Sequence, residues 1–248
     1  MTTKSWIIFS VLCIAILGGL IWVSRGDRID VTDIDPTVVQ IASNKNGQIA
    51  DHTYGNMNSK VVLIEYGDYQ CPGCGSAAPV IKKVVDKYKD KIGFVFRNFP
   101  LYEKHPNAFA ASATAEAAGL QGKYWEMHEK LYANQDAWSQ LSGVDRTNYF
   151  ASLADQIGLK GSDLTSRLDD ASIKKKIDFD TALGKKVGIT GTPSFYLNGK
   201  EVGNQDVKDG KLIPSDNDTT TPPVWSDETA FETLVLNPVL QQNGISLP

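Results

Sequence analysis

A Cys-Pro-Gly-Cys motif at residues 71–74 follows a strand-like run, and this arrangement constrains the fold more than any other feature of the chain. Lys60–Tyr66 is rich in apolar and β-branched residues, which is typical of a buried strand. A link over 67–70 leads into the two cysteines, and a lysine-rich amphipathic stretch then continues to about Lys91. The sequence therefore predicts a strand, a short turn that carries the cysteines, and a helix.

The spacing of the two cysteines assigns them different chemical roles. Cys71 falls at or just before the start of the helix, where unpaired N–H groups and the helix dipole favour a thiolate over a thiol. Only the thiolate attacks a disulfide. Cys74 lies one turn further along the same helix face, close enough to displace a partner from Cys71. Cys71 is thus the expected nucleophile and Cys74 the resolving thiol.

Three simpler explanations of the cysteine pair compete with redox catalysis. A zinc site needs two further thiolate or imidazole ligands, and His52, His105 and His128 have no spacing that suits one. A purely structural disulfide across two residues closes a very small loop and adds little stability. A peptide-binding module without redox activity also stays open. We expect no metal site.

The composition allows a large soluble domain and excludes nucleic-acid binding. The chain has 248 residues, of which 42% are hydrophobic, so it can bury a sizeable core. Its formal net charge is −4, and no basic face is evident.

An uncharged run at residues 6–23 predicts a membrane anchor. As a helix it would be about 27 Å long, close to the ~30 Å hydrocarbon core of a bilayer. Trp6 and Trp22 stand near its ends, as interfacial anchors do. Because no clear small-residue cleavage site follows, an uncleaved signal-anchor is favoured over a removed signal peptide, which remains the alternative.

The same anchor predicts where the cysteine pair works. A large domain after one N-terminal span is most simply translocated, which places Cys71 and Cys74 in an oxidising extracytoplasmic space, with the chain held in the cell membrane by a single pass. The charges that flank the run do not fix its orientation by themselves. Cys13 lies inside the run and cannot reach the pair, so every cysteine expected outside the membrane belongs to one motif.

The remaining pattern predicts an α/β domain that is interrupted by helices. A second strand at 92–99 makes a parallel βαβ unit with the first. Helices are expected at 108–118, 122–135, 145–157 and 162–187. Asn198-Gly199 predicts a hairpin turn, 203–223 reads as a surface loop, and a final helix is expected from Ser226 to about Leu236.

These elements give a thioredoxin-like α/β fold with an inserted all-helical domain, preceded by a transmembrane helix. The expected divisions are a signal-anchor, a linker with a short edge strand or hairpin near 38–49, a first thioredoxin-like part, the helical domain and a second thioredoxin-like part. Their boundaries are 1–25, 26–59, 60–102, 103–187 and 188–248.

Several motifs, taken in order, resemble the DsbA-like thiol-disulfide oxidoreductases, in particular the membrane-anchored BdbD-type branch. The resemblance covers nearly everything from Lys60 to the final helix. It rests on the active-site segment EYGDYQCPGC, on FRNFPL, HPNA and QGKYWEMH in the helical part, and on GITGTPSF near the second strand region, which occupy residues 65–74, 96–101, 105–108, 121–128 and 188–195.

The resemblance implies roles for three further residues. Thr192-Pro193 matches the family's cis-proline loop, and a cis bond there would leave the backbone of Thr192 free to pair with an extended substrate. A trans proline that starts a strand is the alternative. Glu65 matches a buried acidic position and would take the proton from Cys74, unless it is simply a surface residue of the strand.

One departure from the family bears on oxidising strength. Strongly oxidising members carry a histidine between the cysteines, whereas this chain has Pro72-Gly73 as the active-site dipeptide. Without that histidine the pKa of Cys71 is expected to fall less, which would make a weaker oxidant.

The resemblance implies an enzyme that needs no cofactor and introduces disulfides into cysteine-containing secreted or membrane proteins. A membrane quinone-linked reoxidase of the DsbB or VKOR type would regenerate it. A reductase or isomerase of the same fold is the enzymatic alternative, and a membrane-tethered peptide-binding module without turnover is the other.

Overall fold

The computed structural model describes residues 3–25, 29–215 and 220–248. The chain divides into two units, Met1–Asp30 and Val31–Pro248, and each is considered by itself.

The first unit contains one helix, α1, Thr3–Arg25, which includes the uncharged run at 6–23. Across the three described ranges, no helix combines the length and the apolar character that crossing a bilayer requires. The transmembrane segment expected over residues 1–25 is therefore not confirmed.

A five-stranded mixed sheet forms the centre of the second unit, in the order β1-β3-β2-β4-β5. β2 and β3 run parallel, while β1 pairs antiparallel with β3, and β4 pairs antiparallel with both β2 and β5. The strands are β1 His52–Gly55, β2 Val62–Gly67, β3 Gly93–Asn98, β4 Ser194–Leu197 and β5 Lys200–Glu201. The predicted parallel pair and the hairpin at Asn198-Gly199 are both confirmed.

Helix α2, Pro72–Tyr88, connects the two parallel strands and completes the predicted βαβ unit. Its apolar face, with Ile81, Val84 and Val85, packs in one core with side chains of β2, β3, β4 and the C-terminal helices. The C-terminal segment consists of a 3₁₀ turn Val224–Ser226, α9 Glu228–Ala230, a π-helical stretch Phe231–Leu236 and α10 Asn237–Gln242.

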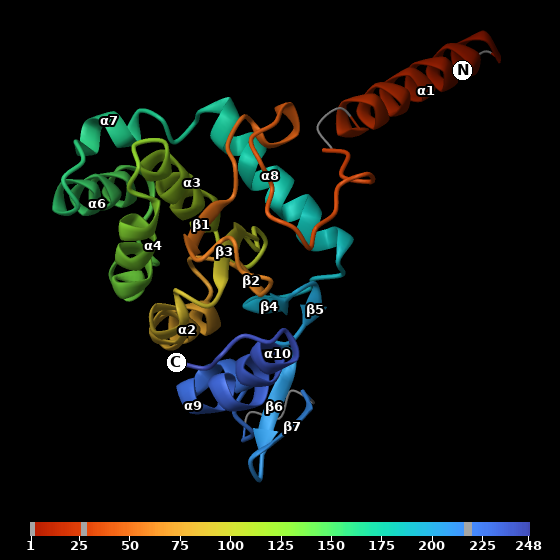
Figure 1. The fold of residues 1–248 in the computed structure, drawn as a ribbon. Coiled ribbons are helices and arrows are strands. Elements are labelled where there is room, and N and C mark those ends of the chain that lie inside the picture. The colour runs from red at the N-terminus through yellow and green to blue at the C-terminus, as the bar shows by residue number, and fades with distance from the viewer. Residues whose placement is uncertain (1–2, 26–28, 216–219) are drawn as a thin grey trace. The chain divides into compact units, whose positions relative to one another are not determined.

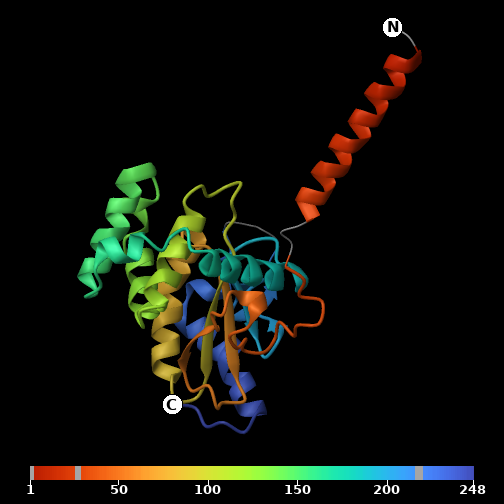
Figure 2. The ribbon, with the colours of Figure 1, turned by 90° about the horizontal axis from the view of Figure 1, so that it is seen from above.

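The helical insertion lies between β3 and β4. Its buried side chains, among them Trp138, Phe150 and a series of alanines, form one core with the cysteine pair and Phe96 of β3. Figure 1 shows α3, α4, α6 and α7 gathered beside the sheet, and Figure 2 shows the same block from above. The insertion contains α3 Ala108–Gly119, α4 Tyr124–Ala133, α5 Gln135–Trp138, α6 Gly143–Gln156, α7 Gly161–Thr165 and α8 Ala171–Lys186.

Two predictions of secondary structure near the insertion and the N-terminus were wrong. The single helix expected at 162–187 is two helices, because α8 starts afresh after Asp170, whose ψ of 128° is not helical. Residues 38–49 contain a 3₁₀ turn, Asn44–Asn46, and no strand. Side chains satisfy this backbone instead: Gln40 donates its N–H to Asp51, and Arg97 donates to the carbonyl of Val38. The short edge strand expected within residues 26–59 is β1, which starts a few residues later than predicted.

The segment 203–223, expected to be a plain loop, contains a second small sheet. Its described part holds β6 Gln205–Lys208 and β7 Lys211–Pro214, which pair antiparallel. Asp209 and Gly210 form the two-residue turn with φ of 52° and 69°, the conformation that an Asp-Gly hairpin favours. The sequence did not predict this hairpin, because apolar and polar residues alternate only weakly in the two strands that flank the turn.

Candidate active site

The cysteine pair lies at the start of α2, as predicted. Cys71 is the N-cap residue, with an extended backbone, and Pro72 occupies the first turn of the helix. The carbonyl of Cys71 accepts the first helical hydrogen bond, from Gly75 N–H, at 3.0 Å. Cys71 is 9% exposed and Cys74 is fully buried, and both are in the free thiol form. Solvent and a partner can therefore reach only the first thiol.

The environment of Cys71 favours its thiolate. Hydrogen bonding to the side chain of Cys74 is the largest influence, followed by Thr192 and by the backbone N–H groups of Cys74 and Gly73. Together these outweigh the opposing effect of burial and lower the pKa of Cys71 to about 5. The pKa of Cys71 is thus lowered without a histidine between the cysteines. That it falls less than in family members with this histidine stays a prediction.

Cys74 has the opposite preference. Complete burial is the main reason that its pKa is raised well above the usual value, and the charges of Cys71 and Glu65 add to the effect. The backbone N–H of Asp68 lies 3.5 Å from its sulfur and partly opposes the shift. At neutral pH the pair is therefore a largely buried thiolate, Cys71, that keeps a small exposed surface, and a fully buried thiol, Cys74. This matches a nucleophile and a resolving group.

Glu65 lies on β2 and is buried. The alternative that it is a surface residue of the strand is therefore wrong. In the sheet it pairs with Phe96 of β3 and Phe195 of β4, and it is 2% exposed. Burial raises its pKa to about 8, and its Oε1 atom has no hydrogen-bond partner among the described residues. A carboxyl group with such a pKa holds a proton at neutral pH and can exchange it with a nearby group.

The cis-proline loop meets the cysteine turn. The Thr192-Pro193 peptide bond is cis. The sulfur of Cys71 lies 3.3 Å from the carbonyl oxygen of Thr192, although the two residues lie 121 positions apart in the sequence, and in its protonated form Cys71 donates a hydrogen bond to that oxygen. A Cβ atom added to Gly73 would lie 3.3 Å from Cδ of Pro193, so the small residue permits this close approach.

A hollow of about 710 Å³ extends from the cis-proline loop, with residues 188–194 along its wall. Trp225 and two acidic side chains, Glu201 and Asp206, also line it. An extended peptide that paired with the backbone of Thr192 would continue into this hollow.

Polar side chains hold the cysteine turn against the helical insertion. Gln135 of α5 donates from its side-chain amide to the carbonyls of Tyr69, at 2.7 Å, and Cys71, at 2.9 Å. Gln70 accepts from the N–H of Asn107 at 2.6 Å. No sequence pattern marks Gln135, because its partners are backbone atoms 64 and 66 positions away.

Asp68 ties the end of β2 to the loop that follows β3. One carboxylate oxygen accepts from the N–H of Gln70 at 2.7 Å. The other accepts from the N–H of Leu101, at 2.8 Å, and pairs with His105 Nδ1, at 2.7 Å. Asp68 lies within the segment that carries the family resemblance, which is the signal that could have identified it.

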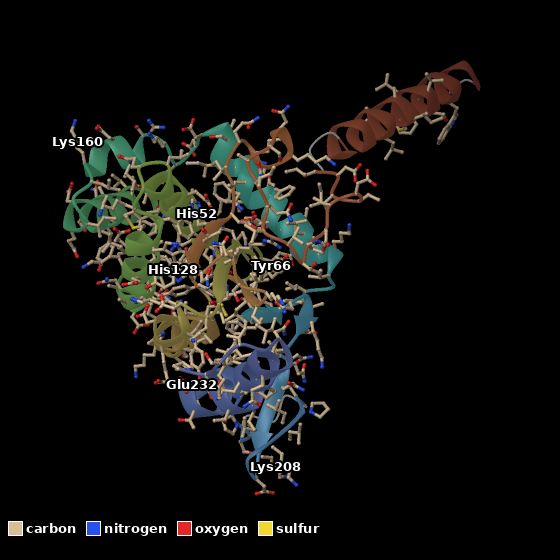
Figure 3. The ribbon with its side chains drawn as sticks, in the orientation of Figure 1. His52, Tyr66, His128, Lys160, Lys208 and Glu232 are labelled. Atoms are coloured by element: carbon tan, nitrogen blue, oxygen red, sulfur yellow. The ribbon has the colours of Figure 1, made fainter. Side chains whose placement is uncertain are left out.

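Each of the three histidines already has a partner. His105 pairs with Asp68, His52 pairs with Glu116 at 2.8 Å, and His128 Nδ1 lies 3.0 Å from the hydroxyl of Tyr69. Figure 3 labels His52 on β1 and His128 on α4. Within the part of the chain that the structure describes, no three His, Cys, Asp or Glu side chains are grouped so as to hold a metal ion.

Comparison with solved structures supports this architecture. BdbD from Bacillus subtilis, in its oxidised form, superimposes with a TM-score of 0.59 at 21% identity, over 83% of this chain and 97% of that chain. MdbA from Corynebacterium diphtheriae, a thiol-disulfide oxidoreductase, gives 0.53 at 22% identity, over 71% of this chain and 94% of that chain. The thioredoxin-like fold with a helical insertion is thereby confirmed.

Among curated proteins, the Na(+)/H(+) antiporter NhaA 1 of Mycobacterium sp. (strain KMS) is 30% identical over 200 residues, which are 80% of this chain. The chain spans 29% of the length of that relative. The family model Thioredoxin_4, described as Thioredoxin, matches residues 47–213, well over half of the sequence. The chain therefore belongs to this thioredoxin family.

Proposed function

We propose that this protein is a thiol-disulfide oxidoreductase that introduces disulfide bonds into cysteine-containing proteins outside the cytoplasm. The observation that carries the proposal is the pairing of a thiol with a pKa of about 5, Cys71, with a fully buried thiol, Cys74, directly beside the cis-proline loop. The similarity in fold to MdbA, a thiol-disulfide oxidoreductase, supports it.

In the oxidised enzyme a disulfide joins Cys71 and Cys74. A substrate thiolate attacks the sulfur of Cys71, which breaks that bond, forms a mixed disulfide and releases Cys74 as a thiolate. Because burial disfavours this thiolate, it takes up a proton, and the protonated carboxyl of Glu65 is the proposed donor.

A second substrate thiolate then attacks the substrate sulfur of the mixed disulfide. Cys71 leaves as a thiolate, the substrate gains a disulfide, and two electrons remain on the reduced pair. The low pKa of Cys71 makes it a good leaving group, which favours transfer of the disulfide to the substrate over retention by the enzyme. The proposed substrate grip is the backbone of Thr192 together with the hollow beside it.

Regeneration requires an oxidant, and a membrane quinone-linked reoxidase of the DsbB or VKOR type is the proposed partner. The location outside the cytoplasm is proposed because a large domain that follows a single N-terminal apolar run, residues 6–23, is most simply translocated. An impermeant thiol reagent applied to intact cells after mild reduction should label Cys71. Protection of Cys71 would contradict that location, and carbonate extraction of membranes tests the predicted anchor.

The direct test of the activity uses a reduced, unfolded protein as substrate. The wild-type chain in its oxidised form should transfer its disulfide to that substrate, and Cys71→Ser should not. Equal behaviour of the two would overturn the proposal. The reduction potential decides the direction, because a potential as low as that of thioredoxins, about −270 mV, would favour the reductase alternative.

A further inference from the structure

A second cavity lies on the other side of the cysteine-bearing helix from the cis-proline loop. It has a volume of about 320 Å³ and is enclosed by α2, α4 and the strands β1 to β3. Ala78, Pro79 and Ile81 of α2 form one wall, and Trp125 and His128 of α4 face them. Its size falls at the lower end of the range for small-molecule sites.

The interior of this cavity is mainly aromatic and aliphatic. The ring of Trp125 packs 5.5 Å from that of Phe94 and 5.7 Å from that of Tyr54, measured between ring centres. Trp125 is fixed by a hydrogen bond of 2.9 Å from its indole N–H to the carbonyl of Thr53. Rigid aromatic walls of this kind suit a flat apolar molecule.

One polar group at the inner end of the cavity lacks a partner. Glu65 lines the cavity, is 2% exposed, and its Oε1 atom has no hydrogen-bond partner in the described ranges. An unpaired polar group in an apolar enclosure is unfavourable, and a ligand atom that pairs with it restores the lost interaction. Because a protonated carboxyl group donates a hydrogen bond, the matching ligand atom is an acceptor.

Two exposed side chains of opposite charge are among the residues that line the cavity, and they mark its mouth. Lys82 of α2 lies 3.4 Å from Glu129 of α4, and these side chains are 40% and 52% exposed. Lys82 also pairs with Asp86 on the same helix. Exposed ion pairs of this kind contribute little free energy, so they can open to admit a ligand.

We propose that this cavity binds a small, neutral aromatic carbonyl compound, whose ring packs on Trp125 and Phe94 and whose carbonyl oxygen accepts a hydrogen bond from Glu65. An anionic ligand is disfavoured because Lys82, the cation at the mouth, is already paired with Glu129 and Asp86, and because an apolar enclosure disfavours an unpaired charge. A bound ligand would also hold the proton on Glu65, and so link the cavity to the protonation of Cys74.

Two bicyclic probes of nearly equal shape test the proposal: 1-indanone, which has a carbonyl acceptor, and indane, which has none. The readout is the NMR signal of the Trp125 indole N–H in the full, reduced chain, assigned from its loss in Trp125→Phe. Trp138 and Trp225 lie outside the cavity lining and serve as internal references. The signal of Trp125 should shift on titration with 1-indanone and reach saturation, while the reference signals stay in place.

The affinity for 1-indanone should exceed that for indane by roughly 2- to 10-fold, the factor expected for one net hydrogen bond. In Glu65→Leu the two affinities should become equal, whereas Glu65→Gln, which keeps a donor, should preserve the difference. Saturation of Trp125 by neither probe would overturn the proposal. Equal affinities in the wild type, or an undiminished difference in Glu65→Leu, would overturn the role of Glu65.

A blocking variant and the pH dependence complete the test. Ala78→Phe fills the cavity and should abolish binding, while Lys83→Phe, an exposed change on the same helix outside the lining, should not.

Affinity for 1-indanone should fall as pH rises through about 8, because ionised Glu65 cannot donate a hydrogen bond. Glu65→Gln should bind independently of pH over that range, which separates Glu65 from the other titratable groups around the cavity: Cys74, Tyr54, Lys82, His128, Glu129 and Tyr132. Binding is read without turnover, so its failure is distinguishable from failure of the proposed enzyme activity.

Discussion

The Cys71 thiol donates a hydrogen bond of 3.3 Å to the backbone carbonyl of Thr192, across 121 positions of sequence. The contact joins the N-cap of α2 to the cis-proline loop before β4. The sulfur that a substrate thiolate would attack in the oxidised form therefore meets the backbone that would hold the substrate. Four predictions follow from the surroundings of this contact.

The first prediction concerns the resolving thiol. Cys74→Ser removes the internal competitor for a mixed disulfide at Cys71, so covalent adducts with substrate proteins should accumulate. Non-reducing electrophoresis followed by mass spectrometry detects them. Cys71→Ser should form none, and equal adduct levels in the two variants would contradict the assignment of Cys71 as nucleophile.

The second prediction concerns the pKa of Cys71. Thiolate absorbance of the reduced protein should titrate with a midpoint near pH 5. Because the Cys74 side chain is the largest influence that lowers this pKa, Cys74→Ala should move the midpoint upward, towards the ordinary cysteine value of about 8.5.

The sign of the stability effect is fixed by the direction of that shift. A thiol with a lowered pKa stabilises the folded, reduced form fully above its unfolded value, about pH 8.5, and this stabilisation is lost as pH falls through about 5. Thermal unfolding of the reduced and oxidised forms across this interval measures it. The stability of the reduced form relative to the oxidised form should increase between pH 5 and 8. The absence of such an increase would contradict the low pKa of Cys71.

The third prediction concerns Glu65, whose pKa is raised. Its folded value is about 8, against an unfolded value of about 4.3, so the wild type loses stability as pH rises between these values. Glu65→Gln has no such proton and should lack this loss. Urea unfolding should therefore give similar free energies of unfolding for the wild type and Glu65→Gln near pH 4. At pH 8 the free energy of unfolding of Glu65→Gln should be higher than that of the wild type, by on the order of a few kcal/mol.

The enzymatic effect of the same change should be opposite in sign. Because Glu65→Gln cannot exchange a proton with Cys74, disulfide transfer should slow by roughly 10²-fold or more, the lower limit for loss of a general acid or base. Stopped-flow kinetics of mixed-disulfide formation would measure this difference in rate between the wild type and Glu65→Gln. An unchanged rate would exclude Glu65 from proton transfer while leaving the stability prediction intact.

The fourth prediction concerns the clamp on the cysteine turn. Gln135→Ala removes the two hydrogen bonds to the carbonyls of Tyr69 and Cys71, and should destabilise the protein by about 1–3 kcal/mol. Gln156→Ala is the matched control, because its partner, Lys130, lies in an exposed contact. Chemical denaturation compares the two, and a Gln156→Ala loss as large as that of Gln135→Ala would contradict the special place of Gln135.

Local signals in the sequence were reliable where one short segment carried the whole pattern. The apolar run before Cys71, the amphipathic stretch after Cys74 and the Asn198-Gly199 turn predicted β2, α2 and the β4–β5 hairpin within a few residues. The Asp209-Gly210 turn carried a comparable signal, but its strands are polar and were missed.

The strand or hairpin predicted near residues 38–49 was wrong in position because buried ionic groups bind this part of the backbone. Arg97 and Asp51 are both fully buried and lie 2.7 Å apart, and they satisfy the backbone of residues that were expected to form a strand. Lys176 of α8, also buried, completes this group with Asp51 at 2.8 Å. No local pattern marks such a cluster, because its members come from three distant segments.

By itself the sequence determined the chemistry and the local elements: a dithiol at the start of a helix, between two parallel strands, followed by a helical insertion. Covalent connectivity and side-chain periodicity fix these features at short range. Only the tertiary structure decided the pKa of Cys71, the isolation of Glu65, the clamp by Gln135 and the cavity behind α2. Each of these depends on burial and on contacts between residues far apart in the chain, which periodicity does not encode.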